Sequence, residues 1–328
     1  DLGLGRVPRV DSYHGWTYDN TGALVGVPFA SGYGGAGAFS KNDLALARVP
    51  RVASIHGFVF GSFAAEGPSL AEHLGAASTA FDRLARLSPN GEVELTAGWV
   101  RHRVRANWKM LLENETDGYH PQFVHASIFG VADSGIAGLY GDKSAAVSRD
   151  LGGGHTENDL RPEFRRIGRP MGWFGTTADR VAGYVARMRE LQGAAAESIL
   201  VDGSPHVMIF PNLFIAEIQL FVIQPLAVDE TVQHVTALQF KGAPDVNERV
   251  LRQTVGSVGP AGFLLADDSE MYERNQVGVS ARAPEWLVLR RGLHRERRDD
   301  DGHLIGDATD EVPQRAIWRH YRALMEAA

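Results

Sequence analysis

Hydrophobic and polar residues alternate in short runs near the start of the chain, a pattern typical of β-strands. The stretch 15–29 alternates on both sides of Asn20-Thr21-Gly22, which is a turn signal between two strands. The stretch 49–63 predicts a further strand or a pair of strands. We therefore expect residues 1–62 to form short β-strands.

Later segments show the spacing of apolar residues that predicts helices. In the first of them, residues 67–91, Ser69 is placed to cap the helix and Glu72 to complete a capping box. Pro89, followed by Asn and Gly, is expected to end this helix, which would separate two domains. The other predicted helices cover residues 108–120, 179–198, 247–278 and 310–327.

The segments between these helices predict a second set of strands. Residues 92–108 alternate as one strand, and residues 206–240 predict several strands in succession, antiparallel to one another. The charged stretch 290–307 predicts a hairpin with a solvated face. Residues 127–165 are rich in Gly, Ser and Asp and predict a long flexible loop. The whole pattern indicates an α+β protein, with domains at 1–62 and 63–328.

Composition narrows the class of protein. A length of 328 residues suggests about two domains, and the 44% apolar and 22% charged shares are ordinary for a globular protein. The net charge of −7, without a basic patch, argues against nucleic acid as a partner. No apolar run reaches the ~18 residues of a membrane span, and no signal peptide is visible. The absence of cysteine excludes disulfides and thiolate metal sites in these residues and fits a cytoplasmic protein.

The segment 113–125, ENETDGYHPQFVH, carries the candidate chemistry. On a straight helix His120 and His125 would point roughly 140° apart, because they are five residues apart. Pro121 has no N–H and its ring forces a helix to bend or break, which can turn both imidazoles toward one point. Asp117, three residues before His120, can accept the second ring N–H of that histidine. The alternative is that both histidines are polar surface residues beside a turn.

An acid pair in a second segment could complete a metal site. Asp267 and Asp268 follow the apolar run 263–265. Such a pair is commonly a helix N-cap with its neighbour in the first turn. Two histidines and one carboxylate are also the ligands of non-haem Fe(II) oxygenases, which leave open positions for O₂.

These two segments, NWKMLLENETDGYHPQFVH and GPAGFLLADDSEMYERNQ, resemble the catalytic domain of the large (α) subunit of Rieske non-haem iron aromatic-ring-hydroxylating oxygenases. The positions that carry the resemblance are Asn107, Trp108, Lys109, Glu113, Asn114, Asp117, Tyr119, His120 and His125. The resemblance extends loosely from Tyr13 to the C-terminus. It implies a catalytic domain with a large curved antiparallel sheet packed on helices, behind a partial all-β Rieske-type domain at 1–62.

The resemblance also implies a set of functional residues. His120, His125 and Asp268 would bind Fe(II), with Asp267 as the alternative carboxylate. Asp117 would link the iron site to the cluster of a neighbouring subunit. The residues that would line the substrate pocket are Asn114, Phe123, Asn212, Val258 and Leu264, although core packing explains each of them as well.

The N-terminal part departs from the family pattern, in which two Cys and two His bind a [2Fe–2S] cluster. The sequence DSYHGWTYD resembles the second half of that motif, with His14 at the histidine position but Asp11 at the cysteine position. The first Cys-His pair is absent. Either residues are missing from this chain, which we expect because the sequence YHGW and the strands predicted after it are intact, or the protein has lost its cluster.

The function that the resemblance implies is addition of O₂ to an aromatic ring as a cis-dihydroxylation, with a monooxygenase or demethylase of the same family as an alternative. Expected partners are a small β subunit in an α3β3 or α3 assembly, a ferredoxin or reductase, and an aromatic substrate. Two other classes remain open. One is a zinc hydrolase with Glu113 or Asp117 as general base, although the His-Glu-x-x-His signature is absent. The other is a binding protein without a cluster that encloses an apolar ligand.

Overall fold

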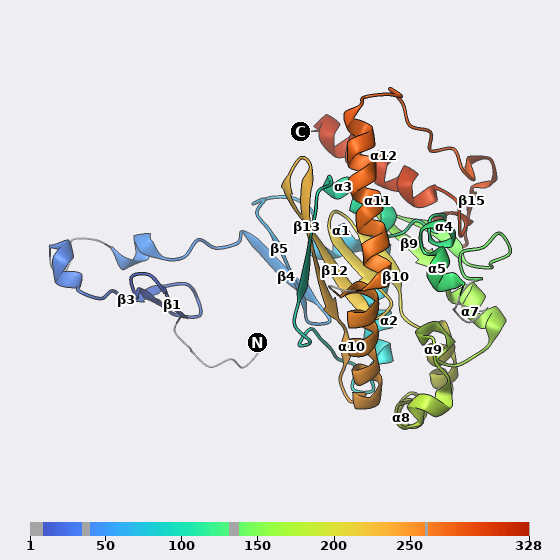
Figure 1. Cartoon of the computed structure of the whole chain (residues 1–328). Helices are drawn as coiled ribbons and strands as arrows, with labels where there is room; N and C mark the ends of the chain where they lie inside the picture. Colours follow the sequence, from blue (N-terminus) through green and yellow to red (C-terminus); the bar gives the residue numbers. More distant parts are fainter. Residues whose placement is uncertain (1–8, 35–39, 131–137, 260–261, 328) are drawn as a thin grey trace. The chain divides into compact units, whose positions relative to one another are not determined.

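The computed structural model describes residues 9–34, 40–130, 138–259 and 262–327. The chain divides into two compact units, one formed by Asp1–Ser54 with Val59–Gly67 and the other by Ile55–Phe58 with Pro68–Ala328. The second unit contains all the described α-helices and the large sheet (Figure 1). Among the described residues, no helix is both long enough and apolar enough to cross a bilayer.

Short strands build the N-terminal region, as predicted. An antiparallel sheet of three strands has the order β1 (Arg9–Val10), β2 (Thr17–Tyr18) and β3 (Leu24–Gly26). The predicted turn between β2 and β3 is confirmed, and Gly22 adopts the positive φ of 84° that this turn requires. The stretch 49–63 forms the predicted strand pair, β4 (Arg51–Ile55) with β5 (Phe58–Ser62).

The second unit is built on a sheet of nine strands, all paired antiparallel. The α+β class and the large antiparallel sheet are therefore confirmed, as are the strands of 206–240 and the hairpin of 290–307. The strands in sheet order are β15 (Arg297–Arg298), β16 (Leu304–Asp307), β8 (Val147–Gly152), β9 (His155–Asp159), β10 (His206–Ile209), β11 (Leu213–Ala216), β12 (Gln219–Ala227), β13 (Glu230–Ala237) and β7 (Val100–Val104). A separate pair joins β6 (Val93–Glu94) to β14 (Gln239–Phe240).

The prediction of a flexible loop over 127–165 is wrong for much of that segment. Strands β8 and β9 lie inside the sheet, and the helix α7 (Arg161–Ile167) follows them. The glycines that suggested a loop form the tight turn between the two strands, where Gly152, Gly153 and Gly154 all have positive φ. Residues 131–137 of the predicted loop lie outside the described residues.

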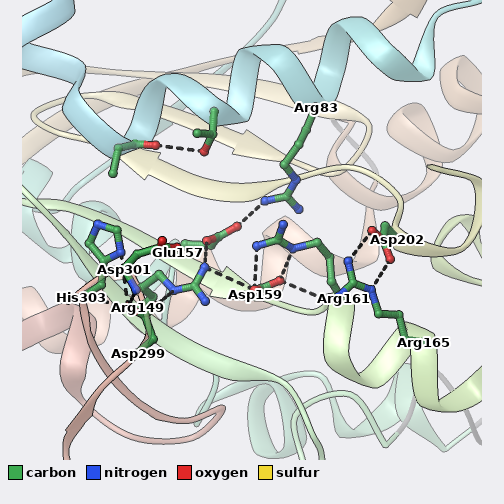
Figure 2. Close-up of polar contacts among 12 residues, drawn as sticks. Arg83, Arg149, Glu157, Asp159, Arg161, Arg165, Asp202, Asp299, Asp301 and His303 are labelled. Carbon is green, nitrogen blue, oxygen red and sulfur yellow. Dashed lines mark hydrogen bonds and ion pairs between the residues drawn. The ribbon is translucent and has the colours of Figure 1, made fainter. Parts of the chain in front are cut away.

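The polar sequence of β9 misled the prediction because its charges are buried in a network of arginines (Figure 2). The Arg83 side chain pairs with Glu157, and Arg149 lies 3.0 Å from Glu157 and 3.3 Å from Asp159. Arg161 makes two parallel hydrogen bonds to Asp159, at 2.7 and 2.8 Å. Burial opposes ionisation of Asp159, but these guanidinium groups outweigh it and lower the pKa of that carboxyl. A charged strand can therefore lie in the interior.

The helices cover the sheet of the second unit, and α10 and α11 form a long pair along its strands (Figure 1). Ser69 and Glu72 form the predicted capping box, although a 3-10 turn at Gly75–Ser78 divides the predicted helix. The helices are α1 (Leu70–Leu74), α2 (Thr79–Leu87), α3 (Trp108–Asn114), α4 (Pro121–Val124), α5 (Ala126–Phe129), α7, α8 (Ala182–Gln192), α9 (Ala196–Asp202), α10 (Pro244–Val258), α11 (Phe263–Ser280) and α12 (Val312–Ala327).

The main hydrophobic core lies between the strands β7 and β10–β13 and the helices α3, α10, α11 and α12. Leu111 and Leu112 of α3 are fully buried there, together with Ile223 of β12. Leu265 and Tyr272 bring α11 into the same cluster. The core thus fixes α3 and α11 to one another, and these helices carry or precede the candidate metal ligands.

A buried histidine couples the stability of this unit to pH. The His155 ring donates from Nε2 to the His73 carbonyl at 2.7 Å, and its Nδ1 accepts from the Phe210 N–H at 3.0 Å. Both contacts suit the neutral ring only. Burial, more than the neighbouring histidines, lowers the pKa of His155 to about 4.

We expect the free energy of unfolding to fall as pH drops from about 6.5 to about 4, because the unfolded chain then binds a proton that the folded chain refuses. Since each unit of pKa is worth about 1.4 kcal/mol, the contribution lost is about 3 kcal/mol. Urea unfolding at pH 7 and pH 4 measures this change in the free energy of unfolding. His155→Gln keeps a donor and an acceptor but does not titrate, so it should lose that much less stability over this range. Equal losses in the two proteins would contradict the assignment.

Candidate active site

The helix that precedes the histidine segment ends earlier than predicted. Asn107 caps α3 by accepting a hydrogen bond from the Lys109 N–H at 3.1 Å, and the helix stops at Asn114. Pro121 occupies the first turn of α4 instead of kinking a longer helix, a position that suits proline because the N–H there has no helical partner. The break therefore covers residues 115–120, and His120 and His125 lie at the two ends of the short helix α4.

The two imidazoles converge with a carboxylate from α11. The His120 and His125 ring centroids are 5.4 Å apart. Asp268 Oδ1 lies 3.6 Å from His120 Nε2 and 3.3 Å from His125 Nε2. One ligand atom from each of the three residues lies within 4.8 Å of the others. A first-row metal ion with bonds of about 2.1 Å holds its ligands at comparable separations.

Two carboxylates face the other nitrogens of these rings. Asp117 Oδ2 lies 3.4 Å from His120 Nδ1, and Asp267 Oδ2 lies 3.5 Å from His125 Nδ1. Asp267 and Asp268 belong to the interior of α11, whose N-cap is Gly262, so the interpretation of this pair as a helix cap is wrong. With a carboxylate behind each ring, both Nε2 atoms point to the centre, which is the arrangement that orients histidine ligands.

The charges of this cluster are incompletely satisfied by the protein. Asp268 Oδ1 and His120 Nδ1 are buried and have no hydrogen-bond partner among the described residues. Burial alone would lower the pKa of His125, but the Asp268 and Asp267 carboxylates outweigh it and raise that pKa. The buried Asp268 Oδ1 faces two imidazoles and has no hydrogen bond. A bound cation would stabilise a carboxylate oxygen in this environment. The donor set of two imidazoles and one carboxylate fits Fe(II).

The cluster opens into a cavity of about 590 Å³ within the second unit. Its wall is mostly apolar and aromatic, with Trp173, Phe174, Phe214 and Phe221 among its members. Such a volume and lining are typical of a site for a small organic ligand.

The structure places three of the five predicted pocket residues in the cavity wall and two outside it. Asn114, Val258 and Leu264 lie in the cavity wall. Phe123 does not: it is 68% exposed on the outer face of α4, against Tyr119. Asn212 also lies away from the wall, in the turn between β10 and β11, where its amide donates to the Ile223 carbonyl.

Several polar residues of the cavity wall were not predicted from the sequence. Glu115 is buried and accepts a hydrogen bond from Gln233 at 2.6 Å; burial, followed by the nearby Asp268 charge, raises its pKa well above the usual range. His206 places Nδ1 2.8 Å from Glu217 and Nε2 2.8 Å from the Glu115 carbonyl. His206 could have been predicted as a site residue because it is a histidine at the start of an apolar strand. No sequence feature predicted Trp173, because its segment lacks periodicity.

The residues described near His14 do not fit a [2Fe–2S] cluster. The Asp11 carboxylate accepts hydrogen bonds from the Tyr13 and His14 N–H groups, at 3.2 and 2.7 Å, so it caps a turn. The sequence contains no cysteine. One histidine and one turn-forming aspartate cannot replace the two Cys and two His that such a cluster needs.

Comparison with known proteins identifies the family. The profile of the ring hydroxylating alpha subunit (catalytic domain) matches residues 92–327, so the chain belongs to this family. It is 30% identical over 319 residues to the 2-halobenzoate 1,2-dioxygenase large subunit of Burkholderia cepacia, covering 90% of this chain and 64% of that protein. It is also 30% identical over 336 residues to the large oxygenase component of the naphthalene 1,2-dioxygenase system of Pseudomonas fluorescens, covering 96% and 72%.

Solved structures agree with this assignment. The fold superimposes on naphthalene 1,2-dioxygenase with indole bound in its active site, with a TM-score of 0.79 and 25% identity, over 96% of this chain and 73% of that one. The chain spans only part of its relatives: 64% of the halobenzoate subunit and 60% of the toluate 1,2-dioxygenase subunit alpha of Pseudomonas putida, which is 29% identical.

Proposed function

We propose that this chain is the catalytic part of an oxygenase that adds oxygen from O₂ to an aromatic ring at a mononuclear Fe(II). The observation that carries the proposal is the convergence of His120, His125 and Asp268 in the wall of a mostly apolar cavity. Fe(II) held by these three residues would supply the activation of O₂. The relatives are dioxygenase subunits by name, which favours this function over a zinc hydrolase or a binding protein.

The protein's own residues would orient the ligands and the substrate. The Asp117 and Asp267 carboxylates lie 3.4 and 3.5 Å from the Nδ1 atoms of the two histidines, which would favour the ring orientation with Nε2 toward the metal. The aromatic wall binds an arene beside the metal and excludes water. Asp117 is 28% exposed, which leaves its carboxylate accessible for the proposed link to a neighbouring subunit.

Electrons and partner chains would come from outside the described residues. Dihydroxylation of a ring consumes O₂, two electrons and two protons, and no cluster can form on His14 and Asp11. We propose that a cluster-bearing segment or chain, fed by a ferredoxin or reductase, supplies them. The relatives are called large or alpha subunits, which supports an assembly with a small β subunit, as α3β3, or an α3 trimer.

The relatives' names support an aromatic ring as the substrate and divide into two chemical classes. One class is aromatic acids, as in 2-halobenzoate, toluate and terephthalate. The other is neutral aromatic compounds, as in naphthalene.

The source of the oxygen in the product tests the function. Fe(II)-loaded protein, given naphthalene, a chemical reductant and ¹⁸O₂, should form a hydroxylated product that carries ¹⁸O. Two labelled atoms would indicate dioxygenation, and one would indicate monooxygenation. The Asp268→Ala variant should form at least ~100-fold less, because metal chemistry needs all three ligands. Oxygen derived only from water, or equal product from the variant, would refute the proposal.

A further inference from the structure

The cavity wall contains acids but no free cation. Besides the three candidate metal ligands and Asp117, the ionisable residues of the wall are Glu115, Glu217, His206, Tyr140 and Tyr272. No Lys or Arg lines the cavity among the described residues. The segments 131–137 and 260–261, which lie outside the described residues, contain no Lys, Arg or His in their sequences.

His206 cannot serve as a free cation for a ligand, because both of its nitrogens are engaged. Nδ1 faces Glu217 at 2.8 Å, and Nε2 faces the Glu115 carbonyl oxygen at 2.8 Å. Burial opposes its protonation, but the Glu217 charge outweighs burial and raises the pKa of His206. Even when the ring is protonated, its charge is balanced by Glu217, so the pair adds no net positive charge to the wall.

Glu115 also offers an anion no positive charge. Only 8% of this residue is exposed, and it lies in the cavity wall. Its hydrogen-bond partner, Gln233, is neutral. When the ring lies beside the metal, a carboxylate substituent would face the rest of the wall, where it would lose its water and meet no guanidinium or ammonium group among the described residues. An uncharged ring would lose only apolar contacts with water, and the aromatic wall replaces those.

We infer that the cavity selects neutral arenes and rejects arenes that carry an ionised carboxylate. The inference rests on the proposed function, because it specifies the substrate class of the same site. The preference follows from a described wall without Lys or Arg, in which the charge of a protonated His206 is balanced by Glu217. Of the two substrate classes among the relatives, the aromatic hydrocarbons fit this chain.

A matched pair of ligands tests the inference without turnover. Naphthalene and 2-naphthoate share the two fused rings and differ in one carboxylate. In equilibrium dialysis against the Fe(II)-loaded protein at pH 7.5, naphthalene should bind at least ~100-fold more tightly, as expected when an anion is desolvated without a partner.

A substitution that supplies the missing cation gives the converse test. Gln253 lies in the wall and donates to the Phe174 carbonyl at 3.3 Å. Gln253→Arg should tighten 2-naphthoate binding at least ~10-fold, whereas Gln253→Met, uncharged and of similar length, should not. Iron content equal to the wild type shows that each variant is folded at the site.

The outcomes separate this inference from the proposed function. If 2-naphthoate binds the wild type as tightly as naphthalene, the charge selection is wrong while the arene site stands. If neither ligand binds the iron-loaded protein, the arene-binding role fails, and the inference fails with it.

Discussion

Replacing Gly118 by alanine is expected to disrupt both the fold around the site and metal binding. A Cβ at this position would lie 1.9 Å from the Ala308 carbonyl oxygen and 3.2 Å from the Tyr140 ring. Ala308 belongs to the backbone between β16 and α12, so neither side can give way by rotating a side chain. Overpacking of this kind costs about 1–3 kcal/mol and sometimes more. Since Gly118 lies between Asp117 and His120, the forced shift should also weaken iron binding at least ~10-fold.

Urea unfolding and iron titration of Gly118→Ala measure these two effects. Gly278→Ala is the matched control, because that glycine lies within α11 and a Cβ there would meet nothing within 4 Å. The control should gain about 0.5–1 kcal/mol from the helix propensity of alanine and keep its iron affinity. A Gly118→Ala protein with wild-type stability and wild-type iron affinity would show that the approach to Ala308 is not needed.

Local patterns were sufficient to predict most elements of the second unit. Alternation marked the strands of 206–240, and helical spacing marked α10, α11 and α12, because each buries one face against the core. The Ser69–Glu72 capping box was predictable because both of its residues lie within one turn of helix.

The wrong predictions share a physical cause: these structures depend on contacts with residues outside the local segment. Strand β9 is as polar as a loop, and only Arg83, Arg149 and Arg161 make its burial possible. Of these, only Arg161 lies beside the strand in the sequence. The end of α3 at Asn114 was likewise not predictable, because the segment after it is shaped by contact with Ala308.

The candidate site was readable from sequence only in part. The histidines and the acid pair stood out as residue types and matched a family motif. Their convergence depends on the packing of α11 against α3, which no local pattern specifies. The wall residue Glu115 lies inside the recognised motif, yet its role as a buried acid became visible only when the cavity around it was known.

Removal of a metal ligand is expected to have the largest effect on function. In the proposed site His120 and Asp268 would each provide one of three protein ligands. Iron bound by two remaining ligands should dissociate during purification. Asp267 is different, because it faces the far nitrogen of His125; Asp267→Asn should bind iron about 10–100-fold more weakly and still fill at excess Fe(II).

The proposed metal site is best tested by the iron content per chain, measured by elemental analysis on anaerobically purified protein after equilibration with excess Fe(II) and desalting. About one iron is expected in the wild type and close to none in His120→Ala and Asp268→Ala. Loss of iron in Asp267→Asn with retention in Asp268→Ala would reassign the carboxylate ligand. No iron in the wild type, or iron unaffected by all of these changes, would contradict the oxygenase account.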